Sequence, residues 1–250
     1  MTFDELVADA AAAPIDGWDF GWLDGRATEE RPPWGYARVI GERAARAERL
    51  LDLQSGGGEV LAGLDGWPRL LVASEGWPPN LPVAARHLRP RGGHVVAAHD
   101  DRAALPFRTG TFDLVTSRHP IRTWWDEVAR VLRPGGRFVS QQVGPHTMRE
   151  LSEALLGPLP DSTAREPRLA IEEAEAAGLV IHDLQEARLR AEFRDIGAIV
   201  WFLRLVVWTV PGFTVEGYRD ELGALHERIE RDGSFVAHST RFLIEASKPA

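Results

Sequence analysis

The chain contains no cysteine. Disulfide bonds, zinc sites built from thiolates and cysteine nucleophiles are therefore excluded, and the composition fits a reducing compartment. The first 14 residues include acidic side chains but no basic segment, which is not typical of a secretion signal. The sequence predicts a cytoplasmic protein.

The chain also lacks a long hydrophobic run. Its most apolar stretch, residues 196–210, is shorter than the roughly 20 residues that a membrane-spanning helix needs. Arg204 interrupts this stretch. We expect a buried or substrate-facing helix here, and no membrane partner.

Basic residues are in deficit. The chain has 29 Lys and Arg against 37 Asp and Glu, a formal net charge of −8. Because general binding to a nucleic acid backbone normally requires a basic face, no nucleic acid partner is expected. The 250 residues are 44% hydrophobic, which is enough for one sizeable core, so we expect a single domain over 1–250.

Short apolar runs alternate with helical stretches along the chain. This pattern predicts an α/β fold: a seven-stranded, mostly parallel, Rossmann-like sheet with helices on both faces. The expected strands cover residues 49–53, 70–74, 94–98, 114–117, 138–143, 179–187 and 241–246. Helices are expected over 36–48, 82–88 and 124–132, the last with Thr123 as its N-cap.

Two segments do not follow this alternation. The first is an N-terminal arm, 1–35, which is rich in glycine, proline and tryptophan. The second, 193–232, inserts two helical segments before the last strand, with Asp195 and Thr214 as the expected N-caps. Additions of this kind commonly build a substrate pocket. The arm and the insert are therefore expected to form a lid over a cofactor-binding core, 36–144.

A glycine-rich turn follows the first expected strand, in the sequence LLDLQSGGGEVL. The dinucleotide pattern G-x-G-x-x-G fails, because its sixth position, counted from Gly56, is Leu61. The pattern D-x-G-x-G-x-G fits better: Asp52, Gly56 and Gly58 match, and Gln54 replaces the first glycine. Taken alone, an ordinary tight turn explains this loop equally well.

Three further features follow in order. Glu75 ends the second expected strand, 23 positions after Asp52, where an acidic residue can accept hydrogen bonds from ribose hydroxyls. A third strand then leads to the acid and LPF of DDRAALPF, and FDLV opens the next. Finally, EVARVLRPGGRF provides a helix, a glycine turn and a fifth strand. Over residues 36–144 the chain resembles the class I S-adenosylmethionine-dependent methyltransferases, in particular those that act on small molecules.

The resemblance implies a function for each matching position. The loop around the methionine part of S-adenosylmethionine would comprise Asp52, Gln54, Ser55, Gly56 and Gly58. Glu75 would hold the ribose, while Asp101 and the backbone of Arg102 would contact the adenine. Ser117 and Arg118 would line the cofactor beside the reactive methyl group.

Gln54 departs from the family pattern, in which glycine lets the backbone pass close to the cofactor. We expect glutamine to fit if its backbone conformation is ordinary and its side chain turns away, or if the side chain contacts the cofactor itself. The alternative is a non-catalytic relative that keeps the fold as a binding or scaffold protein.

The acceptor side is expected after the fourth strand of the core. His119 lies there and is the candidate general base, because imidazole can take a proton near neutral pH. Its alternative function is to order the turn at Pro120 or to bind substrate without taking a proton. Trp34, Tyr36 and Trp201 are candidate substrate-binding residues in an aromatic-walled pocket, although packing explains most of the nine tryptophans.

The sequence therefore predicts an enzyme that transfers a methyl group from S-adenosylmethionine to a small molecule. No spacing of histidine and acidic residues indicates a metal site. Besides the scaffold protein, a methyltransferase acting on RNA or protein remains an alternative, although the acidic balance disfavours RNA. The glycine spacing argues against a nicotinamide-dependent oxidoreductase.

Overall fold

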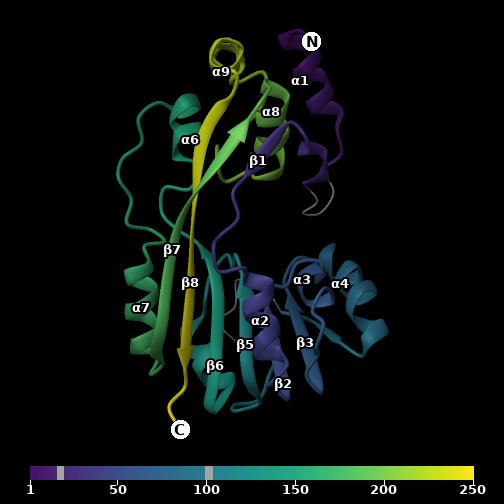
Figure 1. The fold of residues 1–250 in the computed structure, drawn as a ribbon, viewed down its shortest axis with the longest axis vertical. Helices are drawn as coiled ribbons and strands as arrows, with labels where there is room; N and C mark the ends of the chain where they lie inside the picture. Colours follow the sequence, from purple (N-terminus) through teal and green to yellow (C-terminus); the bar gives the residue numbers. More distant parts are fainter. Residues whose placement is uncertain (16–19, 99–103) are drawn as a thin grey trace. The chain divides into compact units, whose positions relative to one another are not determined.

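The computed structural model describes residues 1–15, 20–98 and 104–250. Within these ranges the strands form one sheet in the order β1-β7-β8-β6-β5-β2-β3-β4 (Figure 1). The strands are β1 (Ala27–Glu29), β2 (Arg49–Leu53), β3 (Leu70–Glu75), β4 (His94–Ala97), β5 (Phe112–Arg118), β6 (Leu132–Val143), β7 (Val180–Phe193) and β8 (Phe235–Ser247). The predicted α/β class is confirmed, with eight strands in place of seven.

The helices alternate with the central strands as expected. They are α1 (Phe3–Ala12), α2 (Tyr36–Ala44), α3 (Glu59–Ala62), α4 (Asn80–Leu88), α5 (Trp125–Val131), α6 (Arg149–Leu156), α7 (Pro167–Ala176), α8 (Ile196–Leu205) and α9 (Arg219–Asp232). The strand that the sequence did not predict is β1, which comes from the N-terminal arm and pairs antiparallel with β7.

The chain divides into two compact units. Unit 1 comprises Met1–Arg31, Pro145–Thr163 and Arg188–Thr240. Unit 2 comprises Pro32–Gly144, Ala164–Ala187 and Arg241–Ala250. Strands β7 and β8 contribute residues to both.

Unit 2 is a sheet covered by helices on both faces. Because successive residues of a strand point to opposite faces, the neighbours Leu50 and Leu51 belong to different clusters. Leu50 packs with residues of α2, α3 and α4, and Figure 1 shows α2 lying along β2 and β5. Leu51 packs with residues of α5 and α7. Strands buried on both sides in this way read as continuous apolar runs in the sequence.

The central strands of unit 2 bring their carboxyl ends to one edge. Strands β3 and β5 both pair in parallel with β2, and β6 pairs in parallel with β5. The segments that follow β2, β3 and β5 therefore emerge at this edge, where ligands of open α/β sheets bind. This topology positions the candidate site.

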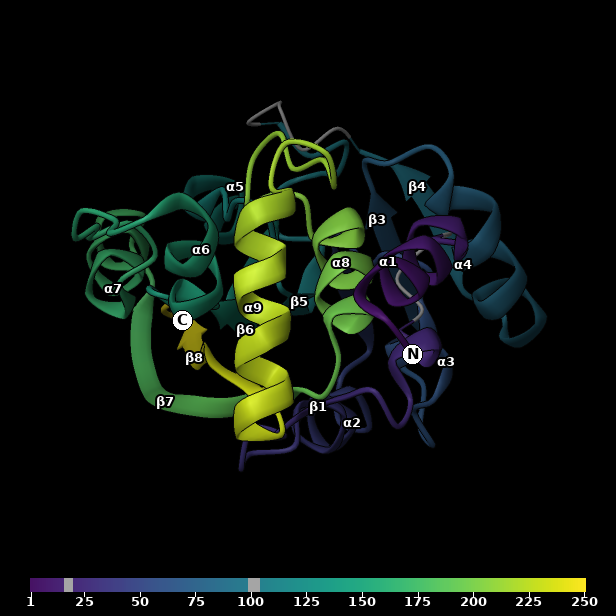
Figure 2. The ribbon, with the colours of Figure 1, turned by 90° about the horizontal axis from the view of Figure 1, so that it is seen from above.

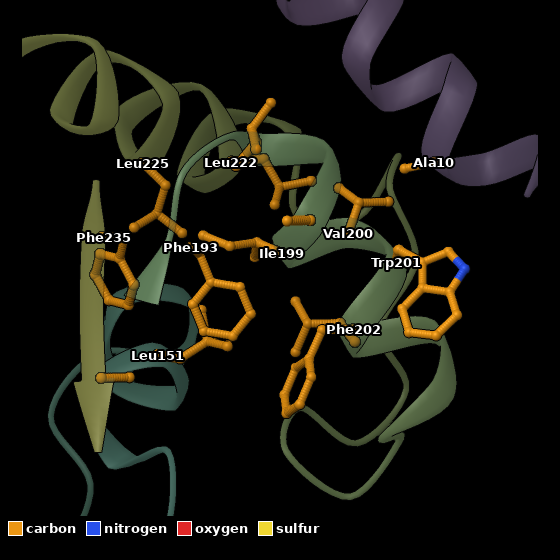
Figure 3. Close-up of a cluster of buried hydrophobic side chains, with 14 of the residues drawn as sticks. Ala10, Leu151, Phe193, Ile199, Val200, Trp201, Phe202, Leu222, Leu225 and Phe235 are labelled. Carbon is orange, nitrogen blue, oxygen red and sulfur yellow. The ribbon is translucent and has the colours of Figure 1, made fainter. Parts of the chain in front are cut away.

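Unit 1 contains residues of the N-terminal arm and of the helical insert, which pack around a separate hydrophobic core. Figure 2 shows α8 between α1 and α9. In this core Phe193 lies between Phe235 and Phe202 (Figure 3). The carboxylate of Asp195 accepts a hydrogen bond from Ala198 N at 2.8 Å, which confirms the predicted N-cap of α8. The lid function of this unit stays a prediction.

Several helix boundaries differ from the predictions. Helix α2 ends at Ala44 rather than at residue 48, because the chain turns before Glu48 donates its N–H to Asp113. The N-cap of α5 is Trp124 rather than Thr123, and no side chain caps it. Thr214 is not the N-cap of α9: its hydroxyl accepts from Gly217 N in a separate turn, and the helix begins at Arg219.

The last two strands are longer than predicted. Strand β7 continues past residue 187 to Phe193, and β8 begins at Phe235 rather than at residue 241. The first part of β8 alternates buried and partly exposed residues, with Phe235, Ala237 and Ser239 buried. A strand with one buried face has this period.

Candidate functional site

The turn after β2 contains three residues with left-handed backbone conformations. The φ angles are 54° at Gln54, 60° at Gly56 and 77° at Gly58. Glycine adopts such angles at little cost, whereas a side chain disfavours them. The first of the two conditions under which glutamine was expected to fit, an ordinary backbone conformation, is therefore not met.

Hydrogen bonds of the Gln54 side chain explain how this conformation is held. Its amide oxygen accepts from Ile121 N at 2.6 Å, and its amide nitrogen donates to Arg122 O at 2.7 Å. The side chain thus bridges the turn after β2 to the segment after β5. It is held by the main chain of residues 121 and 122.

Glu75 connects the turns that follow β2 and β3. Its side chain is buried, and one carboxylate oxygen accepts from Gly56 N at 2.6 Å. The other accepts from Trp77 N at 2.7 Å. Because each carboxylate oxygen has two acceptor positions, both oxygens keep capacity for a hydroxyl donor such as a ribose.

Asp52 is buried beneath the same turn. Thr116 donates its hydroxyl to the Asp52 carboxylate at 2.5 Å. Burial raises the pKa of this carboxyl group to about 6, and the hydrogen bond from Thr116 opposes the rise. Asp52 is therefore an acid whose charge changes close to neutral pH.

The surface beside Gly56 is open. A Cβ added to Gly56 would meet no atom within 4 Å, whereas one added to Gly58 would lie 3.1 Å from the buried Leu88 side chain. Gly58 thus serves packing, and Gly56 leaves room for a ligand next to the backbone. The nearby Trp77 side chain is 62% exposed.

The residues at the end of β5 bond to their neighbours in unit 2. The Ser117 and Ser140 hydroxyls share a hydrogen bond of 2.7 Å, and Tyr36 donates its hydroxyl to Ser117 O at 2.8 Å. Burial raises the pKa of Tyr36 well above its ordinary value. Tyr36 therefore stays a donor, and Ser117 belongs to a buried polar network rather than to an open wall.

His119 lies at the end of another hydrogen-bonded row. Trp34 Nε1 is 2.7 Å from Gln141 Oε1, and Gln141 Nε2 is 2.8 Å from His119 Nε2. Burial lowers the pKa of His119 to about 3, and the positive charges of Arg241 and Arg118 add to this shift. The structure thus brings together two predicted substrate-binding residues, Trp34 and His119, through Gln141.

Trp201 belongs to unit 1. It is 1% exposed, stacks on Trp22 with ring centroids 5.7 Å apart, and donates its indole N–H to Pro14 O at 3.0 Å. Figure 3 shows its ring directed away from Phe193 and Phe202. The remaining predicted residues, Asp101 and Arg102, lie in 99–103, outside the described residues.

Sequence reasoning missed Gln141 and Trp77. Gln141 lies near the carboxyl end of β6, and a polar pair in the sequence VSQQVG was the available signal. Trp77 follows Glu75 by two positions, and an exposed indole next to a candidate ligand-binding acid was the second signal. Both residues lie in unit 2.

In residues 1–15, 20–98 and 104–250, no group of three or more histidine and acidic side chains is arranged to hold a metal ion. No helix in those ranges is both long and apolar enough to cross a membrane.

Part of unit 2 matches a known family. Residues 51–140 match the family described as Methyltransferase domain. This segment lies entirely in unit 2 and contains the turn after β2, Glu75 and His119. Together with the fold, this match supports the resemblance to the class I S-adenosylmethionine-dependent methyltransferases that the sequence shows.

Individual relatives share parts of the chain. A demethylmenaquinone methyltransferase of Thermus thermophilus is 37% identical over 106 residues, which are 39% of this chain and 48% of that protein. The chain spans about half the length of the curated relatives it matches.

Solved structures share the fold. The YcgJ protein of Bacillus subtilis has a TM-score of 0.61 at 17% identity and covers 86% of this chain and 98% of its own. A geranyl diphosphate methyltransferase in complex with SAM has a TM-score of 0.53 at 15% identity, covering 85% and 84%.

Proposed function

We propose that the protein is an S-adenosylmethionine-dependent methyltransferase that acts on a small molecule. The observation that carries this proposal is the buried Glu75 carboxylate, which accepts hydrogen bonds from Gly56 N and Trp77 N within the matched segment. It presents a fixed acceptor beside an open glycine backbone at the carboxyl edge of the sheet.

The described residues fit the adenosine end of this cofactor. Glu75 would accept hydrogen bonds from the ribose hydroxyls through its remaining acceptor positions. The exposed indole of Trp77 would offer a flat face to the adenine ring. Asp101 and the backbone of Arg102 are the proposed partners of the adenine edge.

The turn after β2 would hold the methionine end. Gly56 leaves open space beside its backbone, and Asp52 supplies a buried acid beneath the turn. Gln54, Ser55 and Gly58 complete this proposed loop. When bound, the cofactor supplies a methyl group on a sulfonium for in-line transfer to an acceptor.

The acceptor is proposed to lie beside Arg118 and His119, with Trp34 and Tyr36 as further candidates for binding it. Holding two reactants in line can lower the barrier by about 7–11 kcal/mol. Positioning by these residues would therefore supply much of the catalysis without a dedicated base.

The names of the curated relatives suggest the first acceptor to test, demethylmenaquinone. An RNA acceptor is less favoured, because the net charge of −8 opposes binding to a phosphate backbone. The non-catalytic alternative rests on Gln54. Its side chain is bonded to residues 121 and 122, so removing it is a direct test of whether it affects cofactor binding.

Calorimetric titration with S-adenosylhomocysteine tests the cofactor proposal. We expect saturable binding by the wild type and weaker binding by Glu75→Ala. No binding at millimolar ligand would contradict the proposal. Binding that appears only in Gln54→Gly would favour the non-catalytic alternative.

A further inference from the structure

The row Trp34–Gln141–His119 has a defined direction. The indole N–H of Trp34 is only a donor, so its partner at 2.7 Å must be the amide oxygen of Gln141. The amide nitrogen of Gln141 therefore faces His119 Nε2 at 2.8 Å. Because an amide NH₂ group only donates, His119 Nε2 must accept.

This direction determines where the imidazole carries its proton. A neutral imidazole has one protonated nitrogen and one acceptor nitrogen. Since Nε2 of His119 accepts from Gln141, the proton lies on Nδ1. Among the described residues Nδ1 has no hydrogen-bond partner, and the residue is partly exposed.

The surroundings hold this arrangement in place. Trp34 and Gln141 are each 3% exposed, so reversing the amide would leave buried donors facing each other, which is costly. Gln141 also accepts a main-chain hydrogen bond from His119 N at 2.7 Å. The same residue thus fixes both the backbone and the ring of His119.

The charges around His119 oppose a second proton. Arg118 and Arg241 are the charged groups that act on the ring, and both disfavour an imidazolium. The pKa of the group, lowered to about 3 mainly by burial, agrees with the geometry. His119 is neutral at physiological pH.

We propose that His119 serves the acceptor side as a neutral hydrogen-bond donor through Nδ1, rather than as a general base, and that Gln141 is the positioning residue that selects this tautomer. The part of this proposal that concerns the acceptor rests on the proposed methyltransferase function. It implies an acceptor with a hydrogen-bond-accepting atom, such as an oxygen, close to the atom that receives the methyl group. Any proton released by the acceptor would leave by another route.

Nitrogen NMR of the full-length protein labelled with ¹⁵N-histidine tests the tautomer directly. A His119→Asn spectrum assigns the signals. At pH 7 we expect His119 to show a protonated Nδ1 and an unprotonated Nε2. A protonated Nε2, alone or in an imidazolium, would overturn the proposal.

Substitution of Gln141 tests whether this residue selects the tautomer of His119. In Gln141→Glu the carboxylate can only accept from His119, so the ring proton should move to Nε2 or a second proton should be added. Gln142→Glu is the matched control on the other face of β6 and should leave the His119 signals unchanged. An unchanged tautomer in Gln141→Glu would contradict the proposal.

Two variants of His119 distinguish a hydrogen-bond donor from a general base at this position. In His119→Asn the side-chain amide N–H can take the place of the imidazole Nδ1–H, and asparagine tolerates the φ of 53° found at this position. With S-adenosylmethionine and demethylmenaquinone, offered in oxidised and reduced forms, we expect His119→Asn to keep turnover within about tenfold of wild type. His119→Ala should lose more. Equal losses in both variants would contradict the donor function.

Binding of S-adenosylhomocysteine separates this proposal from the proposed function. If the ligand binds and His119 has a protonated Nε2, the donor function fails and the proposed function stands. If His119 has the expected tautomer and the ligand does not bind, the proposed function fails. In that case the proposal that His119 donates a hydrogen bond to a methyl acceptor fails as well, because it rests on the methyltransferase function.

Discussion

The side-chain oxygen of Gln54 accepts a hydrogen bond from Ile121 N at 2.6 Å, across 67 positions of sequence. The Gln54 backbone has a φ of 54°, in the region that favours glycine. Gln54 therefore replaces the conformational freedom of a glycine with a bridge between the turn after β2 and the segment after β5. This substitution does not prevent the turn from forming.

Two substitutions of Gln54 separate the cost of its left-handed backbone from the stabilisation that its side-chain hydrogen bonds provide. Gln54→Ala keeps a side chain at a left-handed position and removes both hydrogen bonds, so we expect it to lower the free energy of unfolding by about 1–2 kcal/mol. Gln54→Gly removes the same bonds without the backbone cost and should be about 1 kcal/mol more stable than Gln54→Ala. Urea unfolding measures both. A less stable glycine variant would show that the left-handed conformation is wrong.

The glycines of the turn should divide between binding and packing. Gly56→Ala places a methyl group in open space, so we expect a loss of about 1 kcal/mol in stability and weaker S-adenosylhomocysteine binding. Gly58→Ala also meets Leu88 and should lose more stability.

Gly92→Ala is the matched control for these variants. Its φ is 83° and its added Cβ also meets nothing within 4 Å. We expect the stability loss of Gly56→Ala without the loss of binding. Calorimetry would contradict the proposed loop if Gly56→Ala bound the ligand as tightly as Gly92→Ala.

Glu75 should contribute to both structure and binding. A glutamine at this position has one acceptor oxygen, so either Gly56 N or Trp77 N loses its partner. We expect Glu75→Gln to lower stability by about 1–3 kcal/mol, and Glu75→Ala to weaken S-adenosylhomocysteine binding by about 1–3 kcal/mol.

Asp113→Asn provides the control for Glu75. The Asp113 carboxylate also accepts from two main-chain N–H groups, those of Glu48 and Arg49, but at the amino end of β2. Its substitution should lower stability without changing ligand affinity. Equal affinity losses in the Glu75 and Asp113 variants would mean that the effect of Glu75 is purely structural.

Asp52 should make stability depend on pH. Its pKa in the folded protein is about 6, above the roughly 4 of an unfolded chain, so the folded state binds the proton more tightly. The Asp52 contribution is therefore most favourable below pH 4 and declines as pH rises to about 6.

Comparison with Asp52→Asn isolates this contribution. Between pH 4 and pH 7, the stability difference should shift by roughly 2 kcal/mol in favour of Asp52→Asn. Denaturant unfolding at several pH values measures it, and Thr116→Val should enlarge the shift because it removes the opposing hydrogen bond. Parallel curves for wild type and Asp52→Asn would contradict the assigned pKa.

The parallel sheet was predictable because its strands are short, buried apolar runs. Leu50 and Leu51 face opposite helix layers, so both must be apolar, and the pattern is visible without tertiary information. The start of β8 was not recognised, because its residues alternate and their buried face belongs to unit 1. The end of α2 was missed for a related reason: Glu48 N bonds to Asp113, far along the chain.

In the candidate site, too, some features are visible in the local sequence and others depend on contacts between distant parts of the chain. The positions of Asp52, Gly56 and Glu75 follow from spacing along the strands. The partners of Gln54 and His119 depend on side-chain contacts between strands, which local sequence does not encode. Gln141 therefore emerged only from the structure, although it determines which imidazole nitrogen of His119 accepts a hydrogen bond.

A crystal structure of the protein with S-adenosylhomocysteine is the most direct test of the proposed site. We expect the ribose hydroxyls within hydrogen-bond distance of the Glu75 carboxylate, the adenine against Trp77, and the amino acid end beside Gly56. A ligand bound away from the carboxyl ends of β2 and β3, or a carboxylate of Glu75 without ligand contact, would contradict the assignment of this cofactor site.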